Sequence, residues 1–265
     1  MPYLGYLLAQ AVKAGQTVAS AITSAASYVT RVGSSVVELS ASAEALKSPS
    51  TGSAVFSGSG NYIEVSSLNN YSGYSGLTVS AWIYSDDLTG NKTAMSNWGA
   101  VQLGNYAWLL FSGQFVDYRF SWLVSGSGTT YYTLNGATNL SEKTWYYITA
   151  TWSPSSMKLY INGNLDASTG TVPSSLANTQ FKTVIGADFD GNTSDSLVRT
   201  FDGNMANAAI WSRALSAEEV RSVMMKSYDD LSASETKGLV SWYALDDISG
   251  TTVPDSHGNF NGTGY

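Results

Sequence analysis

The 265-residue chain contains no cysteine, only one histidine and only five prolines, and just 12% of its residues are charged. The absence of cysteine excludes disulfide bonds, thiolate metal sites and cysteine nucleophiles. The sole histidine, His257, stands in the turn-like segment "DSHGN". A serine-hydrolase triad or a histidine-ligated metal would need this residue beside a nucleophile or a second group of ligands. We expect His257 to be a solvated turn residue.

Basic residues are also scarce. The 13 lysines and arginines are outnumbered by 20 aspartates and glutamates, which gives a formal net charge of −7. Basic residues scattered over the whole chain cannot form the positive surface that a phosphate backbone requires, so we expect no nucleic-acid partner. No uninterrupted apolar run reaches about 18 residues, the length that a membrane-spanning helix needs. The segment "MPYLGYLLAQAVKAG" lacks the basic region of a signal peptide, so we also expect no cleaved leader.

The chain is rich, by contrast, in residues of β-sheets and turns, with 8 Trp, 17 Tyr, 8 Phe and 25 Gly. From residue 54 onward, apolar and polar residues alternate with a period of two. In "GLTVSAWIY", one face of the expected strand is formed by Leu77, Val79, Ala81 and Ile83. Many such runs, separated by Gly, Asn and Ser turns, predict a two-sheet antiparallel sandwich.

Two local signals within this region are sharper. The dipeptide Asn162-Gly163, which follows "KLYI", predicts a β-hairpin with a type I′ turn. Ser216 and Glu219 form a capping box before "VRSVMM", which predicts one short helix in an otherwise β-structured domain.

The N-terminal segment has a different period. Its apolar residues recur at alternating steps of four and three, the spacing of a left-handed coiled coil. β-branched residues at both core positions favour a trimer over a dimer, and the flanking positions carry small, uncharged side chains. The larger seam residues, which we expect to hold the oligomer together, are Leu4, Leu8, Val18, Ile22, Val29, Val32, Val36, Leu39 and Leu46.

Two alternatives to the coiled coil stay open. The segment could be a low-complexity tail rich in Ala, Ser and Thr, or a single helix docked on the β-domain. The unbroken spacing favours the coiled coil, and a helix roughly 65 Å long would exceed the width of such a domain. We therefore predict a helical stem over residues 1–48, a linker over residues 49–53 and a β-domain, the head, over residues 54–265.

Five blocks of the head carry a resemblance to a known family. They are "AVFSGSGNYIEV", "LTVSAWIY", "TWYYITATWSPSSMKLYINGNL", "KTVIGADFDG" and "FDGNMANAAIWSRALSAEEVRSVM". In this order the blocks resemble the laminin-G-like, concanavalin A-like jelly-roll family. The resemblance implies an all-β, two-sheet antiparallel jelly-roll sandwich with one short helix. The stretch 238–264 resembles the block that usually opens such a domain, which implies a circular permutation.

Some relatives in that clan are glycosidases, which need two carboxylates flanking the scissile bond. The nearest acidic pairs in this chain lack the alternate spacing that places two carboxylates on one strand face. These pairs are Asp86/Asp87, Glu218/Glu219 and Asp246/Asp247. We therefore predict no catalytic residues and no enzyme activity.

Oxygen ligands suited to calcium occur in two places. The first group, in "ADFDGNTSD", is Asp188, Asp190, Asn192 and Asp195, and the second is Asp255 with Asn259. The resemblance supports the first group, because the family often binds ligand or calcium at this loop edge. An ordinary Asx-rich turn explains the same pattern equally well.

The expected function is binding. Aromatic rings at loop edges can stack on sugar faces, and the candidates by composition are Trp98, Tyr106, Trp108, Tyr131 and Tyr132. We predict a homo-oligomeric display protein at a virion surface, such as a phage fibre or appendage. Its heads would bind host-surface glycan or a neighbouring structural protein. The alternative is a secreted or cell-surface bacterial carbohydrate-binding adhesin.

Overall fold

The computed structural model describes residues 30–32, 35–37, 48–113, 118–190 and 196–265. The chain divides into two units, residues 1–46 and residues 47–265. Among the described residues, no helix has the length and apolar character needed to cross a membrane.

In the N-terminal unit, the described residues form a short antiparallel pair, β1 (Thr30–Val32) with β2 (Ser35–Val37). These six residues, which include Val32 and Val36 of the predicted seam, are therefore extended where a helix was expected. β-Branched residue types such as valine and threonine favour extended backbone over helix. The rest of the seam lies outside the described residues, so the coiled coil stays a prediction. These remaining seam residues are Leu4, Leu8, Val18, Ile22, Val29, Leu39 and Leu46.

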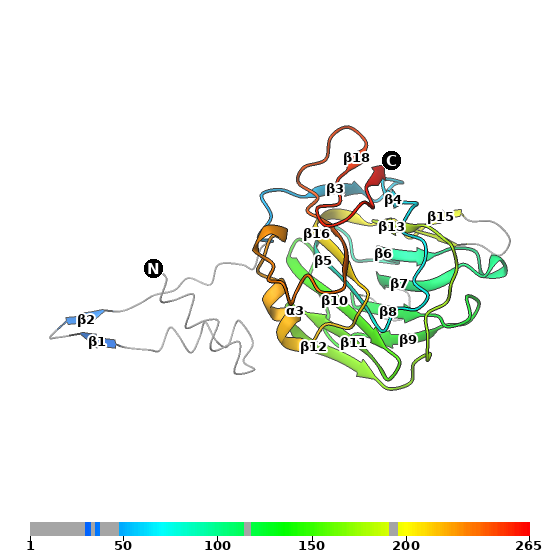
Figure 1. The fold of residues 1–265 in the computed structure, drawn as a ribbon. Helices are drawn as coiled ribbons and strands as arrows, with labels where there is room; N and C mark the ends of the chain where they lie inside the picture. Colours follow the sequence, from blue (N-terminus) through cyan, green and yellow to red (C-terminus); the bar gives the residue numbers. More distant parts are fainter. Residues whose placement is uncertain (1–29, 33–34, 38–47, 114–117, 191–195) are drawn as a thin grey trace. The chain divides into compact units, whose positions relative to one another are not determined.

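The head is a sandwich of two antiparallel sheets, as the alternation predicts (Figure 1). The first sheet has the strand order β12-β11-β10-β5-β16-β17, with β3 also beside β16. Its strands are β3 (Ala54–Ser57), β5 (Leu77–Ser85), β10 (Trp145–Ser153), β11 (Ser156–Ile161), β12 (Asn164–Thr169), β16 (Asp202–Trp211) and β17 (Leu239–Tyr243).

The second sheet has the strand order β18-β19-β4-β13-β6-β7-β8-β9. Its strands are β4 (Ile63–Val65), β6 (Lys92–Trp98), β7 (Tyr106–Ser112), β8 (Phe120–Val124), β9 (Tyr132–Asn135), β13 (Thr183–Ile185), β18 (Thr252–Val253) and β19 (Gly262–Gly264). The core fills the space between the two sheets. Leu77, Val79, Ala81 and Ile83 all contribute to it, so the predicted inward face of β5 is confirmed.

Helix α3 (Ala217–Val223) covers the outer face of the first sheet (Figure 1). The predicted capping box is present: the Glu219 amide donates to Ser216 Oγ at 3.2 Å, and the Ser216 amide donates to the Glu219 carboxylate at 2.8 Å. The indole of Trp82 on β5 donates to the Met224 carbonyl at 3.1 Å, which fixes the end of the helix to the sheet. Two 3₁₀ turns, η1 (Val101–Leu103) and η2 (Tyr228–Asp230), complete the helical elements of the described residues.

The predicted hairpin is also confirmed. β11 and β12 pair antiparallel around Asn162-Gly163, whose φ angles of 50° and 75° are both positive, as a type I′ turn requires.

The C-terminal strand of the head lies in the second sheet, beside the second strand of the head. β19, near the C-terminus, pairs with β4. Beyond that pair, the Tyr265 amide donates to the Tyr62 carbonyl at 2.9 Å, and the two rings stack with centroids 4.9 Å apart. The C-terminus is therefore held against the start of β4, and the circular permutation stays a prediction.

The segment predicted as a linker is bound to the head. The Asp246 carboxylate accepts hydrogen bonds from Ser50 Oγ at 2.9 Å, Thr51 N at 3.1 Å and Thr51 Oγ1 at 2.6 Å. Partial burial opposes the change, but these bonds lower the pKa of Asp246 below its ordinary value. Residues 50 and 51 are therefore anchored to the loop after β17.

Candidate functional site

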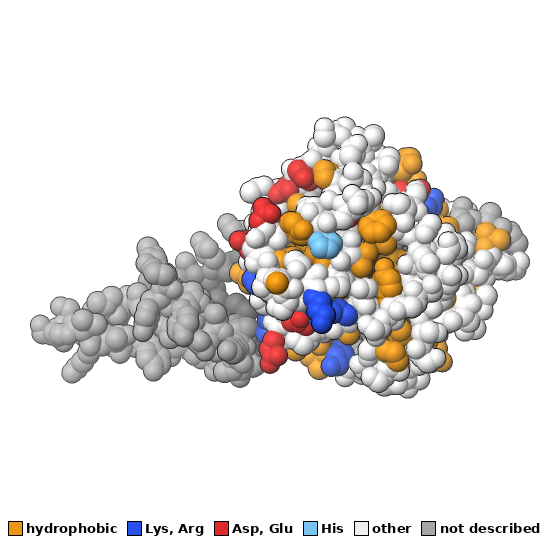
Figure 2. Space-filling view, viewed as in Figure 1, with side chains coloured by type: hydrophobic (Ala, Val, Ile, Leu, Met, Phe, Trp, Pro, Cys, Tyr) orange, Lys and Arg blue, Asp and Glu red, His pale blue; other side chains and the backbone are white. Residues whose placement is uncertain are grey.

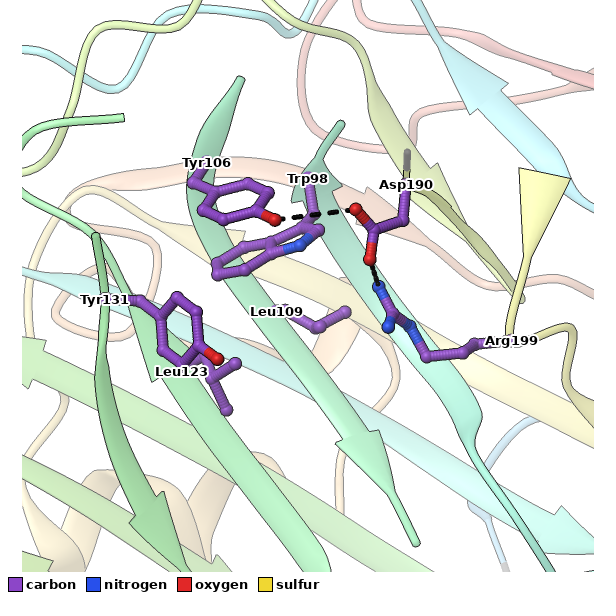
Figure 3. A pocket seen from close by; sticks show the side chains of 7 residues that line it. All are labelled: Trp98, Tyr106, Leu109, Leu123, Tyr131, Asp190 and Arg199. Atoms are coloured by element: carbon purple, nitrogen blue, oxygen red, sulfur yellow. Dashed lines mark hydrogen bonds and ion pairs between the residues drawn. The ribbon is translucent and has the colours of Figure 1, made fainter. Parts of the chain in front are cut away.

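The outer face of the second sheet carries a pocket over β6, β7 and β8 (Figure 3). Its empty volume is about 230 Å³, part of which is open to solvent. The lining residues are Trp98, Tyr106, Leu109, Leu123, Tyr131, Asp190 and Arg199. Along β7 and β8, Leu109 and Leu123 alternate with Trp108 and Val124, which belong to the core. The lining therefore faces away from the core.

Three aromatic side chains form one side of the pocket. Trp98 and Tyr106 are buried and stack with their ring centroids 3.9 Å apart and an interplanar angle of 14°. Tyr131 meets both rings edge-on, with centroids 5.4 Å from Trp98 and 6.0 Å from Tyr106. Tyr131 is 42% exposed, so a rigid aromatic pair supports one solvent-facing ring.

The opposite side is ionic. A short hairpin of β14 (Asp188–Asp190) and β15 (Ser196–Val198) places Arg199 between two carboxylates. Arg199 Nε donates to both oxygens of the fully buried Asp188 at 3.0 Å, and Nη2 donates to Asp188 and, at 3.0 Å, to Asp190. Thr93 Oγ1 on β6 also donates to Asp188, at 2.7 Å. Two carboxylates thus share one guanidinium.

Burial and these charges set the ionisation of the site. Burial alone would lower the pKa of Arg199, but the two carboxylates hold it above its ordinary value. Burial raises the pKa of the Asp188 carboxyl, and the guanidinium opposes that rise. Burial, together with the nearby Asp190 carboxylate, raises the pKa of Tyr106 to about 12. Tyr106 is therefore a neutral phenol at physiological pH, and its hydroxyl lies 3.5 Å from Asp190 Oδ1.

Gly186 allows the hairpin to reach this position. It joins β13 to β14 with a φ of +86°, which an L side chain rarely adopts, and a Cβ there would lie 2.3 Å from the Phe56 ring. Its amide donates to the Ala94 carbonyl of β6 at 2.9 Å. The chain can therefore leave the sheet and present Asp188 and Asp190 on its outer face.

The structure brings together three of the five aromatic residues that the sequence singled out. Trp98, Tyr106 and Tyr131 share the pocket, whereas Trp108 is fully buried in the core. Tyr132 is 38% exposed but lies opposite the core residue Val124 in the β8–β9 pair, so it is on the inward side of its strand. Sequence reasoning missed Arg199. In sequence, Arg199 is the only basic residue between Lys182 and Arg213, and it stands shortly after an aspartate-rich segment. A single arginine in this position could have suggested an ion pair with those aspartates.

The calcium candidates are engaged in other ways. Arg199 supplies the positive charge beside Asp188 and Asp190, while Asn192 and Asp195 lie outside the described residues. The Asp255 carboxylate accepts backbone N–H bonds from Trp242 at 2.9 Å, His257 at 3.0 Å and Phe260 at 3.1 Å. Asn259 is exposed in the same turn. In the described part of the chain, no three carboxylate or histidine side chains form a metal-binding cluster, and calcium binding stays a prediction.

His257 and one member of two of the acidic pairs contact neighbouring side chains. His257 Nδ1 lies 3.1 Å from the Tyr228 hydroxyl, and the ring is seen at the surface (Figure 2). Asp87 pairs with Lys92 at 2.9 Å, and Glu219 pairs with Arg213 at 2.7 Å. On the face shown in Figure 2, charged side chains are few and scattered.

Several solved structures share this fold at low sequence identity. The head resembles a Bacteroides ovatus protein whose assigned role is carbohydrate binding, with 21% identity and a TM-score of 0.62 over 80% of this chain. The match spans 57% of that larger chain. A carbohydrate-binding module (CBM40) of the Ruminococcus gnavus IT-sialidase, solved with α2,3-sialyllactose, gives 13% identity and a TM-score of 0.52 over 67% of this chain and all (100%) of the module.

A heptameric SAP-like pentraxin from Limulus polyphemus gives 14% identity and a TM-score of 0.51, over 79% of this chain and 93% of the pentraxin. At these identities the likeness shows the fold alone. No curated protein matches the chain. The family model of the concanavalin A-like lectin/glucanases superfamily, of laminin-G type, matches residues 57–221, more than half of the sequence. The chain belongs to this family.

Proposed function

We propose that the head is a non-enzymatic carbohydrate-binding module and that the pocket on the outer face of the second sheet is its binding site. One observation carries the proposal: the half-exposed Tyr131 ring stands on a stacked Trp98–Tyr106 pair, beside the ion-paired Asp190. Sugar recognition combines an aromatic ring for the apolar sugar face with polar groups for its hydroxyls, and the pocket offers both.

Two further points support it. The aromatic pair is buried and held by neighbours, so little side-chain entropy is lost when Tyr131 contacts a ligand. Proteins of this fold include the IT-sialidase module solved with α2,3-sialyllactose and the Bacteroides ovatus protein with an assigned carbohydrate-binding role.

Tyr131→Ala tests the proposal, with Tyr132→Ala as its matched control. The full chain is applied to a broad array of immobilised glycans, and the affinity of each variant is measured for the glycans bound. Loss of the stacking ring should weaken binding by up to about tenfold, because one aromatic contact contributes about 0.5–1.5 kcal/mol.

Tyr132→Ala removes an equally large, similarly exposed side chain from the adjacent position on the other side of the strand, and binding should not change. A head that binds no glycan, or two variants with equal affinity, would contradict the proposal.

A finer proposal concerns valency. We propose that the N-terminal segment assembles several copies, so that weak heads act together and avidity rises without new contacts. The heptad spacing of residues 4–29 and 39–46, outside β1 and β2, supports this idea. A virion fibre or appendage is the setting we propose for such display, and a secreted or cell-surface bacterial adhesin is the alternative.

A further inference from the structure

The charges around the pocket favour one class of sugar. Among the described lining residues, Asp190 and Arg199 are the charged ones, and Asp188 lies buried behind them. The Arg199 guanidinium already bonds both carboxylates. Asp188, Asp190 and Arg199 together therefore carry one net negative charge. A sugar carboxylate placed here would meet that excess charge in a partly desolvated site, where like charges repel strongly.

Hydrogen-bonding capacity at the pocket matches a hydroxyl group. A hydroxyl donates one hydrogen bond and accepts others, so it fits best where a donor and an acceptor stand side by side. Arg199 Nη1 has no hydrogen-bond partner among the described residues, whereas Nε and Nη2 are directed at carboxylates. The carboxylate oxygens of Asp190 have several lone-pair positions, so they can accept a bond from a ligand in addition to those from protein donors such as Arg199 and Tyr106.

Arg199 and Asp190 lie together on one side of the pocket, across from Tyr131 (Figure 3). A pyranose ring with its apolar face on Tyr131 would turn its hydroxyls toward Arg199 and Asp190. We infer that the pocket selects neutral sugars with adjacent free hydroxyls and discriminates against uronic and sialic acids. The inference rests on the proposed function, because it names the ligand class of the same site.

The test uses pairs of immobilised glycans that differ by a carboxylate, namely glucosides against glucuronides and lactose against α2,3-sialyllactose, within the broad array. Neutral glycans should be bound, and each acidic partner should bind at least about tenfold more weakly, as expected for an unfavourable charge contact. Binding of the neutral glycans should not change with salt concentration, because no charged pair is formed with the ligand.

Asp190→Asn removes the excess charge while keeping an amide oxygen that can accept from Arg199. This variant should bind neutral glycans about tenfold more weakly, because a charged acceptor is lost. The difference in affinity between each neutral glycan and its acidic partner should also become smaller. The matched control is Asp247→Asn, which removes the same charge from an exposed residue after β17 on the other sheet. Melting temperatures of both variants verify that they fold.

The outcomes separate the two proposals. Acidic glycans bound in preference to neutral ones, with binding lost in Tyr131→Ala, would overturn the inference and leave carbohydrate binding intact. The same holds if Asp190→Asn binds neutral glycans as well as the parent protein does. A chain that binds no glycan on the array would overturn carbohydrate binding itself.

Discussion

At the scale of single residues, Glu235 shows how a buried carboxylate stabilises the head. Its side chain is 5% exposed and accepts bonds from Lys226 Nζ at 2.7 and 2.8 Å. The Ser232 amide and hydroxyl add bonds of 2.7 and 2.6 Å. Burial alone would raise the pKa of Glu235, but these bonds, together with one from the Ser222 side chain, lower it to about 2. The carboxylate therefore fixes the chain after α3 in one conformation.

Glu235→Gln should lower the free energy of unfolding by about 1.5–3 kcal/mol at neutral pH, the range for hydrogen bonds to a charged group. The folded-state pKa lies below the unfolded one, so this stability is present above about pH 4.5 and is lost as the pH falls towards 2. The difference between parent and variant in urea unfolding should therefore shrink between pH 7 and pH 3. Glu218→Gln, an exposed neighbour on α3, is the control and should change little. An equal difference at both pH values would contradict the assignment.

Residue-level predictions from sequence succeeded where polar and apolar residues alternate along a strand and failed where they do not. On β5, serine and threonine separate the apolar residues, so the inward face was readable. On β7, "YAWLLFS" is buried throughout because the outer face is covered as well. Trp98 and Trp108 then look alike in sequence, although one lines the pocket and the other fills the core.

At the scale of elements, the β14–β15 hairpin depends on the conformation of Gly186. Gly186→Ala should destabilise the head by about 2–5 kcal/mol, adding the left-handed backbone penalty to a clash with the Phe56 ring. Gly73→Ala is the matched control, because Gly73 has a similar φ of +80° but no atom within 4 Å of the added Cβ. It should show the backbone penalty of about 1–2 kcal/mol alone. Chemical denaturation measures the free energy of unfolding of both variants. An equal decrease in the two variants would show that the clash with Phe56 is relieved.

Elements that are specified by a few adjacent residues were predictable from the sequence, whereas the β14–β15 hairpin was not. Helix α3 and the Asn162-Gly163 turn are each specified within a few residues by a capping box and a type I′ dipeptide. The hairpin is held instead by Thr93 on β6, which bonds an aspartate 95 positions later in the chain. A single sequence does not reveal such a distant pair, so the ionic half of the site was missed although its aspartates were noticed as possible calcium ligands.

At the scale of the whole molecule, assembly through the N-terminal segment is open to a direct measurement. The head has a core of its own and needs no partner to bury it, so residues 48–265 should be monomeric in light scattering. The full chain should be trimeric, because β-branched residues occupy both core positions of the heptad seam.

A charge placed in the seam separates a coiled coil from any other mode of association. Ile22→Asp puts an unpaired carboxylate at a core position of the heptad and should convert the full chain to monomers, since burying that charge is costly. Thr23→Asp introduces the same charge at the next residue, on the outward side of the same heptad, and should leave the trimer intact. If both variants keep the parent's mass, or both lose it, the heptad seam is not the interface. The multivalent display that we propose would then need another surface, and the affinity of a single head would become the quantity that decides biological binding.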